Sequence, residues 1–260
     1  MPGEEWARRI VQAELGRPVH LNDDGRSPSQ YDLRIGSVDA PEVAIEVVGA
    51  VDKLFTETWN IGPAEGPLHL PIEGDWILEI TTECRVKKLR DAAESLLQEL
   101  ELRGIENVQV EHRLHWTDEP LFNQLNDVGI RWARCYRSPG SGTVHLTMPG
   151  IGGAVDNAGA ALPTWLGEFL RDARRADVIR KLDLPCAISR EAFIIVTFSG
   201  APWLVESYLT GSLDVIPPHS PDLPSPISGA WVVSGGNSKG VRWDGTKWSI
   251  FRASGAAIVA

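Results

Sequence analysis

The chain has 260 residues, of which 43% are hydrophobic, 23% charged and 7% aromatic, a composition typical of a folded globular protein. This apolar content excludes an intrinsically disordered chain, and the longest apolar runs fall far short of the ~20 residues that a membrane span needs. The first residues lack the basic start and apolar stretch of a signal peptide. Three separated cysteines (Cys84, Cys135 and Cys186) indicate reduced thiols. We therefore expect a cytoplasmic protein with no part in the membrane.

Charge is unevenly distributed along the chain, which carries a net charge of −10. Residues 1–137 contain 25 acidic and 15 basic side chains, whereas residues 138–260 contain 10 of each. An acidic field repels phosphate backbones, so the composition argues against a non-specific nucleic-acid coat protein. A divalent metal ion, however, would invert this logic locally.

Apolar periodicity in the first half predicts alternating helices and strands. The predicted helices cover residues 4–15, 85–103 and 120–128, and residues 50–60 form either a short helix or an irregular excursion. The predicted strands cover 18–21, 31–36, 42–48, 76–81, 107–114 and 130–137. This alternation is typical of a mixed α/β sheet covered by helices. A Ser-Pro-Gly-Ser-Gly segment at residues 138–142 follows and is predicted to be a hinge.

The second half is predicted to be an additional α+β region. It contains predicted strands over 143–148, 192–199, 229–234 and 240–251, and predicted helical segments over 163–182 and 203–209. The apolar face of the first helical segment does not continue, which indicates a break near Ala173. The predicted domains are therefore 1–137 and 138–260, with one continuous domain left as an alternative.

Arg171, Arg174 and Arg175 have helical spacing (i, i+3 and i+4), so they are expected to share one face. Such a face is either solvated or a patch that contacts phosphates. These arginines are the candidate nucleic-acid-binding residues, and nucleic acid is the candidate partner.

Two carboxylates lie in neighbouring predicted strands. Glu46 is the single polar side chain in an apolar run, and a lone buried carboxylate needs a cation, hydrogen-bond donors or a metal ion. Either Arg34 on the adjacent strand neutralises Glu46, or Asp32 and Glu46 converge on a divalent metal. Two hard oxygen ligands suit Mg²⁺ or Mn²⁺, which activate water for phosphodiester hydrolysis.

The element order and three acidic residues across residues 4–114 resemble the PD-(D/E)XK, or restriction-endonuclease-like, superfamily. These residues are Glu14 near the end of the first helix, Asp32 opening a strand and Glu46 in the next apolar strand. The resemblance implies that Asp32 and Glu46 hold the metal, that Glu14 assists, and that a lysine two residues after the glutamate activates water. The expected function is therefore a metal-dependent nuclease with a restriction-endonuclease-like core in the first half.

The sequence departs from the family pattern at the lysine, because Val48 occupies that position. Lys53 is the candidate replacement, reaching back from the next segment. The alternative function is a catalytically inactive member of the fold that binds protein or nucleic acid. A third interpretation has no active site, with Arg34 pairing with Glu46. A lysine amine within hydrogen-bond reach of Asp32 and Glu46 would favour the enzyme.

Overall fold

The structure is a computed structural model that describes residues 2–22, 30–110, 119–148, 155, 157–197, 199–235 and 239–252. The chain forms two compact units. The first unit combines Met1–Val51 with Gly152–Ala260, and the second unit is Asp52–Ile151. Each unit contains a mixed β-sheet with helices packed on it, which confirms the predicted α/β class.

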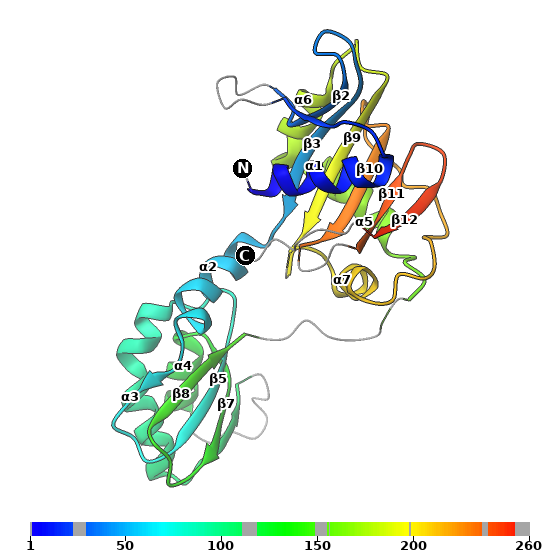
Figure 1. The fold of residues 1–260 in the computed structure, drawn as a ribbon. Helices are drawn as coiled ribbons and strands as arrows, with labels where there is room; N and C mark the ends of the chain where they lie inside the picture. The colour runs from blue at the N-terminus through cyan, green and yellow to red at the C-terminus, as the bar shows by residue number, and fades with distance from the viewer. Residues whose placement is uncertain are drawn as a thin grey trace. The chain divides into compact units, whose positions relative to one another are not determined.

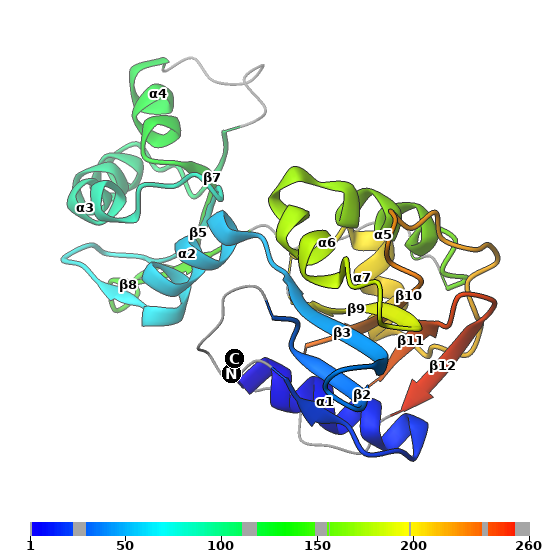
Figure 2. The same cartoon turned by 90° about the horizontal axis from the view of Figure 1, so that it is seen from above.

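The first unit is built on a seven-stranded sheet (Figures 1 and 2). Its strands, in spatial order, are β1 (His20–Leu21), β2 (Leu33–Gly36), β3 (Pro41–Ala50), β9 (Ser189–Val196), β10 (Gly229–Ser234), β11 (Lys239–Trp243) and β12 (Trp248–Arg252). The three central strands β3, β9 and β10 are parallel, and the outer pairs are antiparallel. Residues 52–151 are thus inserted between β3 and the strand that pairs with it.

Helices cover both faces of this sheet. Helix α1 (Pro2–Leu15) lies on one face, and α5 (Leu162–Arg171), α6 (Ala176–Leu182) and α7 (Trp203–Thr210) lie on the other (Figure 2). The apolar stripe of α1, including Trp6 and Ile10, packs on Ile45 and Phe193. Even-numbered neighbours in β3 such as Ala44 instead belong to the core under α5 to α7. Strand alternation therefore assigns each side chain of β3 to one core or the other.

The second unit is built on a five-stranded sheet with helices on one side (Figure 1). Its strands, in spatial order, are β4 (Leu68–His69), β8 (Thr143–Thr147), β5 (Asp75–Ile80), β7 (Ile130–Arg137) and β6 (Asn107–Gln109). Its helices are α2 (Lys53–Ile61), α3 (Val86–Leu102) and α4 (Glu119–Asp127), and a short 3-10 helix, η1 (Pro63–Glu65), follows α2. A second short 3-10 helix, η3 (Ala173–Arg175), follows α5 in the first unit. The apolar side of α3 fills a core formed within this unit alone.

The predicted domain boundary after residue 137 is wrong, because β7 and β8, on either side of it, belong to the same sheet. The predicted hinge at 138–142 is their connection. The buried carboxylate of Asp75 anchors it, accepting hydrogen bonds from the Ser141 amide (2.7 Å), the Ser141 hydroxyl (3.0 Å) and the Thr143 amide (2.9 Å). These bonds also lower the pKa of Asp75, the Thr143 amide contributing most.

Within the described ranges, no helix combines the length and the apolar character that crossing a bilayer requires.

Candidate functional site

Asp32 and Glu46 lie on one face of two neighbouring strands, as the sequence predicts. Asp32 precedes β2, and its amide donates a hydrogen bond to Ile45 O at 3.1 Å. Leu33 is aligned with Ile45 in the antiparallel ladder, so Asp32 stands opposite Glu46. Directly opposed residues of antiparallel strands project to the same side. Each residue is only 4% exposed, and both face the core under α6.

A lysine from a distant part of the chain completes this group. Lys181, in the last turn of α6, donates a hydrogen bond from Nζ to Glu46 Oε1 at 2.7 Å. The two side chains are 15% and 5% exposed, so this is a buried ion pair. Among the described residues, Glu46 Oε2 is buried without a hydrogen-bond partner. The site therefore has one acceptor oxygen that this pairing leaves unsatisfied.

The electrostatics of the group are set by burial. Burial raises the pKa of Glu46 to about 8, with the nearby charges of Asp32 and Asp177 adding to the rise and Lys181 opposing it. Asp32 is held by a different contact, a 2.7 Å hydrogen bond from the Val47 amide to its Oδ2. Glu46 is thus poised to exchange a proton near neutral pH, beside a lysine.

The predicted pairing of Arg34 with Glu46 is wrong, because a different cation neutralises Glu46. Arg34 Nη1 donates to the Gly36 carbonyl at 2.6 Å, and Lys181 provides the charge at Glu46. Sequence reasoning missed Lys181 because it is 135 residues from Glu46 along the chain. The available signal was indirect: a buried carboxylate requires a cation, but the strand pattern does not indicate which element supplies it.

Two predicted catalytic residues do not join the group. Glu14 is an exposed residue of α1, which packs on the opposite face of the sheet from Glu46. Lys53 begins α2 in the second unit and forms an exposed ion pair with Glu57 at 3.6 Å. Among the described residues, neither is a partner of Asp32 or Glu46, so neither prediction is supported by the geometry.

The three arginines predicted as a phosphate-contacting patch do not share one helical face. Helix α5 ends at Arg171, and Asp172, with φ −57° and ψ 131°, separates it from η3. Arg171 pairs with Asp222, Arg174 pairs with Asp172 at 2.6 Å, and the guanidinium of Arg175 lies 4.7 Å from the ring centre of Phe169. The predicted break near Ala173 is confirmed, and it removes the periodicity on which the patch depended.

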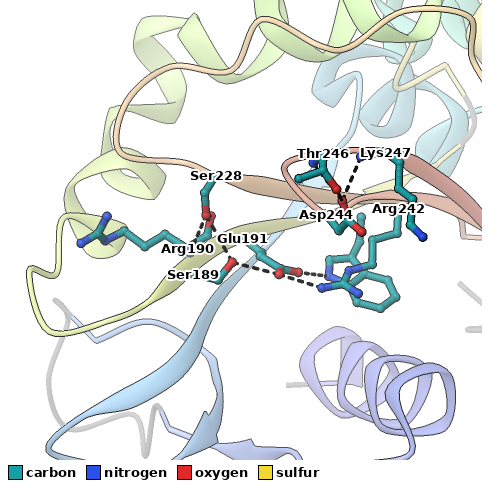
Figure 3. Close-up of polar contacts among 9 residues, drawn as sticks. Ser189, Arg190, Glu191, Ser228, Arg242, Asp244, Thr246 and Lys247 are labelled. Atoms are coloured by element: carbon teal, nitrogen blue, oxygen red, sulfur yellow. Dashed lines mark hydrogen bonds and ion pairs between the residues drawn. The ribbon is translucent and has the colours of Figure 1, made fainter.

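Another buried carboxylate, Glu191, which was not identified from the sequence, lies on the α1 side of the first unit's sheet (Figure 3). Glu191 accepts hydrogen bonds from Trp231 Nε1 at 2.6 Å, Arg242 Nη2 at 2.8 Å and Ser189 Oγ at 3.1 Å. The Arg242 guanidinium lies 4.6 Å from the Trp231 ring centre. Both oxygens of Glu191 are satisfied within the protein, which marks this cluster as a structural tie between β9, β10 and β11.

Among the residues that the structure describes, no group of three or more His, Cys, Asp or Glu side chains could hold a metal ion. Two carboxylates are nonetheless enough for Mg²⁺ or Mn²⁺ when waters and substrate phosphates supply the remaining ligands. The hard oxygens of Asp32 and Glu46, and the unsatisfied Oε2 of Glu46, fit that requirement.

No protein-family model matches the chain, and no curated protein or solved structure is significantly similar to it.

Proposed function

We propose that this protein hydrolyses phosphodiester bonds in nucleic acid with the help of Mg²⁺ or Mn²⁺, at the site formed by Asp32, Glu46 and Lys181. The observation that carries the proposal is the 2.7 Å hydrogen bond from Lys181 to Glu46. It provides the lysine amine that the sequence lacks at Val48, next to two carboxylates on one sheet face.

The order of elements in the first unit supports the same proposal. Helix α1, the antiparallel strands β1 to β3, a helical segment and β9 follow one another there, with the second unit inserted after β3. This is the helix, three strands, helix, strand order that suggested the PD-(D/E)XK superfamily. The helix and the last strand of this order are, however, not the predicted ones. The helix over residues 85–103 (α3) and the strand over 107–114 (β6) belong to the second unit, and α6 and β9 take their places in the first unit. We propose membership of that superfamily on this basis.

Each residue has a distinct role in the proposed reaction. Asp32 and Glu46 would hold the metal ion, which when bound polarises the phosphate and promotes ionisation of water. Lys181 holds a positive charge beside Glu46, so it would stabilise the negative charge that develops on the phosphate and donate a proton to the leaving oxygen. The raised pKa of Glu46 means that metal binding must displace a proton, so activity should increase as the pH rises towards 8.

The second candidate function is a catalytically inactive binding module. It is favoured by the 4% exposure of both carboxylates, because catalysis requires a substrate phosphate to reach side chains that are almost fully buried.

We also propose a cytoplasmic location, because a nucleic-acid substrate is present there and the three cysteines are free thiols, as in a reducing compartment.

The test is cleavage of plasmid DNA and of single-stranded circular DNA by the full-length protein with Mg²⁺ or Mn²⁺. We expect cleavage by the parent and a loss of at least about 100-fold in Asp32→Asn, Glu46→Gln and Lys181→Met. Lys53→Met and Glu14→Gln are matched controls that should cleave as the parent does. Circular dichroism must show that each variant is folded. The double variant Glu46→Gln/Lys181→Met replaces both charged side chains of the buried pair with neutral side chains of similar size, so neither charge is left without its partner.

Absence of cleavage by the parent, or equal cleavage by all variants, would overturn the proposal that the protein is a nuclease and would favour the catalytically inactive binding module.

A further inference from the structure

The sheet of the second unit has one face packed and one face open. Trp76, Leu78, Ala133 and Val144 belong to the core under the helices. Because successive strand residues alternate between faces, the residues between them project to the other side. Among the described residues, no helix packs on this second face (Figure 1).

The open face is rich in rings and includes a guanidinium and a carboxylate; it is defined here by Ile77, Glu79, Asn107, Trp132, Arg134, Tyr136 and His145. Arg134 is aligned with Asn107 on β6 and with Ile77 on β5, which is itself aligned with His145 on β8. Trp132 lies two residues before Arg134 on β7, and Tyr136 lies two residues after it. These three side chains follow one another along one strand at a spacing of about 7 Å.

Contacts with neighbouring strands position the two aromatic rings on this face. Trp132 Nε1 donates a hydrogen bond to Asn107 Oδ1 at 2.9 Å. The Tyr136 ring lies against His145 with ring centres 6.2 Å apart, while Tyr136 remains 48% exposed. Rings held on a sheet surface in this way are preorganised for stacking, because little side-chain entropy remains to be lost.

The charge on the open face contrasts with that of its unit. Residues 52–151 contain 16 acidic and 10 basic side chains. On this face, however, the carboxylate of Glu79 is paired with Arg131 at 3.5 Å. Arg134 is exposed, and within the described part of the chain no ion pair neutralises it. Among the described residues, the face therefore presents a local positive charge between two aromatic rings.

We propose that the open face binds single-stranded nucleic acid, with Trp132 and Tyr136 stacking on bases and Arg134 contacting the phosphate backbone or stacking as well. Single strands are recognised by aromatic platforms with interspersed positive charge, because their bases are not stacked on one another. A duplex offers no such faces. This inference rests on the proposed function, and it specifies the form in which the substrate is held.

The test measures binding without cleavage. Full-length protein in EDTA is titrated against fluorescein-labelled oligo(dT) and oligo(U) of about 15 nucleotides, and against a duplex of equal length, by fluorescence anisotropy. We expect single strands to bind more tightly than the duplex, with affinity falling as salt increases. Arg134→Ala/Tyr136→Ala should raise the dissociation constant at least about 10-fold.

Matched variants separate a binding role from a structural one. Arg103→Ala/Trp59→Ala removes an exposed arginine and an exposed aromatic ring elsewhere in the same unit, and should change affinity by less than about twofold. Tyr136→Phe keeps the ring and should retain binding. Tighter binding of DNA or of RNA supports the proposal in either case and identifies the substrate.

Failure of this proposal is distinguishable from failure of the nuclease proposal. The anisotropy titration is made in EDTA and does not require metal-assisted cleavage, so single-strand binding by a parent that fails to cleave would leave this proposal standing. No binding of single strands, equal binding of the duplex, or parental affinity in Arg134→Ala/Tyr136→Ala would overturn the proposal, whatever the plasmid assay shows.

Discussion

At the scale of single residues, the burial of the Glu46 carboxyl links stability to pH. Glu46 has an ordinary pKa of 4.5, and burial raises it to about 8 in the folded protein. Between these values the folded protein retains a proton that the unfolded chain releases. Unfolding then releases protons, and the free energy of unfolding falls as the pH rises.

We expect this contribution to be complete below about pH 4.5 and lost by about pH 8, with a limiting slope of about 1.4 kcal/mol per pH unit. Glu46→Gln cannot ionise and should flatten the curve. Urea unfolding at several pH values in this window provides the measurement. Glu14→Gln is the control, and a slope unchanged by Glu46→Gln would contradict the assignment of the proton to Glu46.

At the scale of secondary-structure elements, local apolar patterns in the sequence predicted individual helices and strands but not which of them pack together. The single acidic residue in the apolar run around Glu46 correctly indicated a buried strand that needs a cation, and the change of apolar face near Ala173 correctly placed the break between α5 and α6. The pattern could not predict that α6 supplies Lys181, because helices and strands pair through tertiary packing. Composition likewise suggested flexibility for Ser138–Gly142, where a buried carboxylate from another strand imposes order.

The turn between β7 and β8 provides a test at this scale. Asp75→Ala removes the three hydrogen bonds that Asp75 accepts from Ser141 and Thr143, two of them from backbone amides. We expect the midpoint of thermal unfolding to fall by several degrees. Asp91→Ala, an exposed position on α3, should leave it nearly unchanged. Calorimetry compares the variants, and equal midpoints for both would show that the turn does not depend on Asp75.

At the scale of the whole molecule, the boundaries of the two units were not predictable from chain order. A glycine- and proline-rich segment looks like a linker whether it joins domains or strands, and the chain leaves the first sheet at Val51 within an otherwise continuous series of elements. The parallel pairing of β3 with β9, which closes the first unit across the insertion, leaves no local mark in the sequence.

These boundaries predict which fragment folds. Residues 52–151 contain a complete apolar core, so this fragment should be soluble and unfold cooperatively. A fragment of residues 1–137 lacks β9, which pairs with β3, and β8, which pairs with β5. That fragment should therefore lack a cooperative transition. Circular dichroism during heating distinguishes them. A cooperative 1–137 fragment, or an unfolded 52–151 fragment, would contradict the two-unit division.

The insertion has a consequence for the order of events in folding. Glu46 and Ala192 are neighbours in the ladder between β3 and β9, yet 146 positions separate them in the chain. The entropy cost of closing a flexible loop grows with the logarithm of its length, by about 0.6 kcal/mol for each doubling. Collapse of residues 52–151 into a compact body shortens the flexible part of that loop. Early folding of the second unit therefore lowers the entropic barrier to pairing β3 with β9, and hence to bringing Lys181 to Glu46.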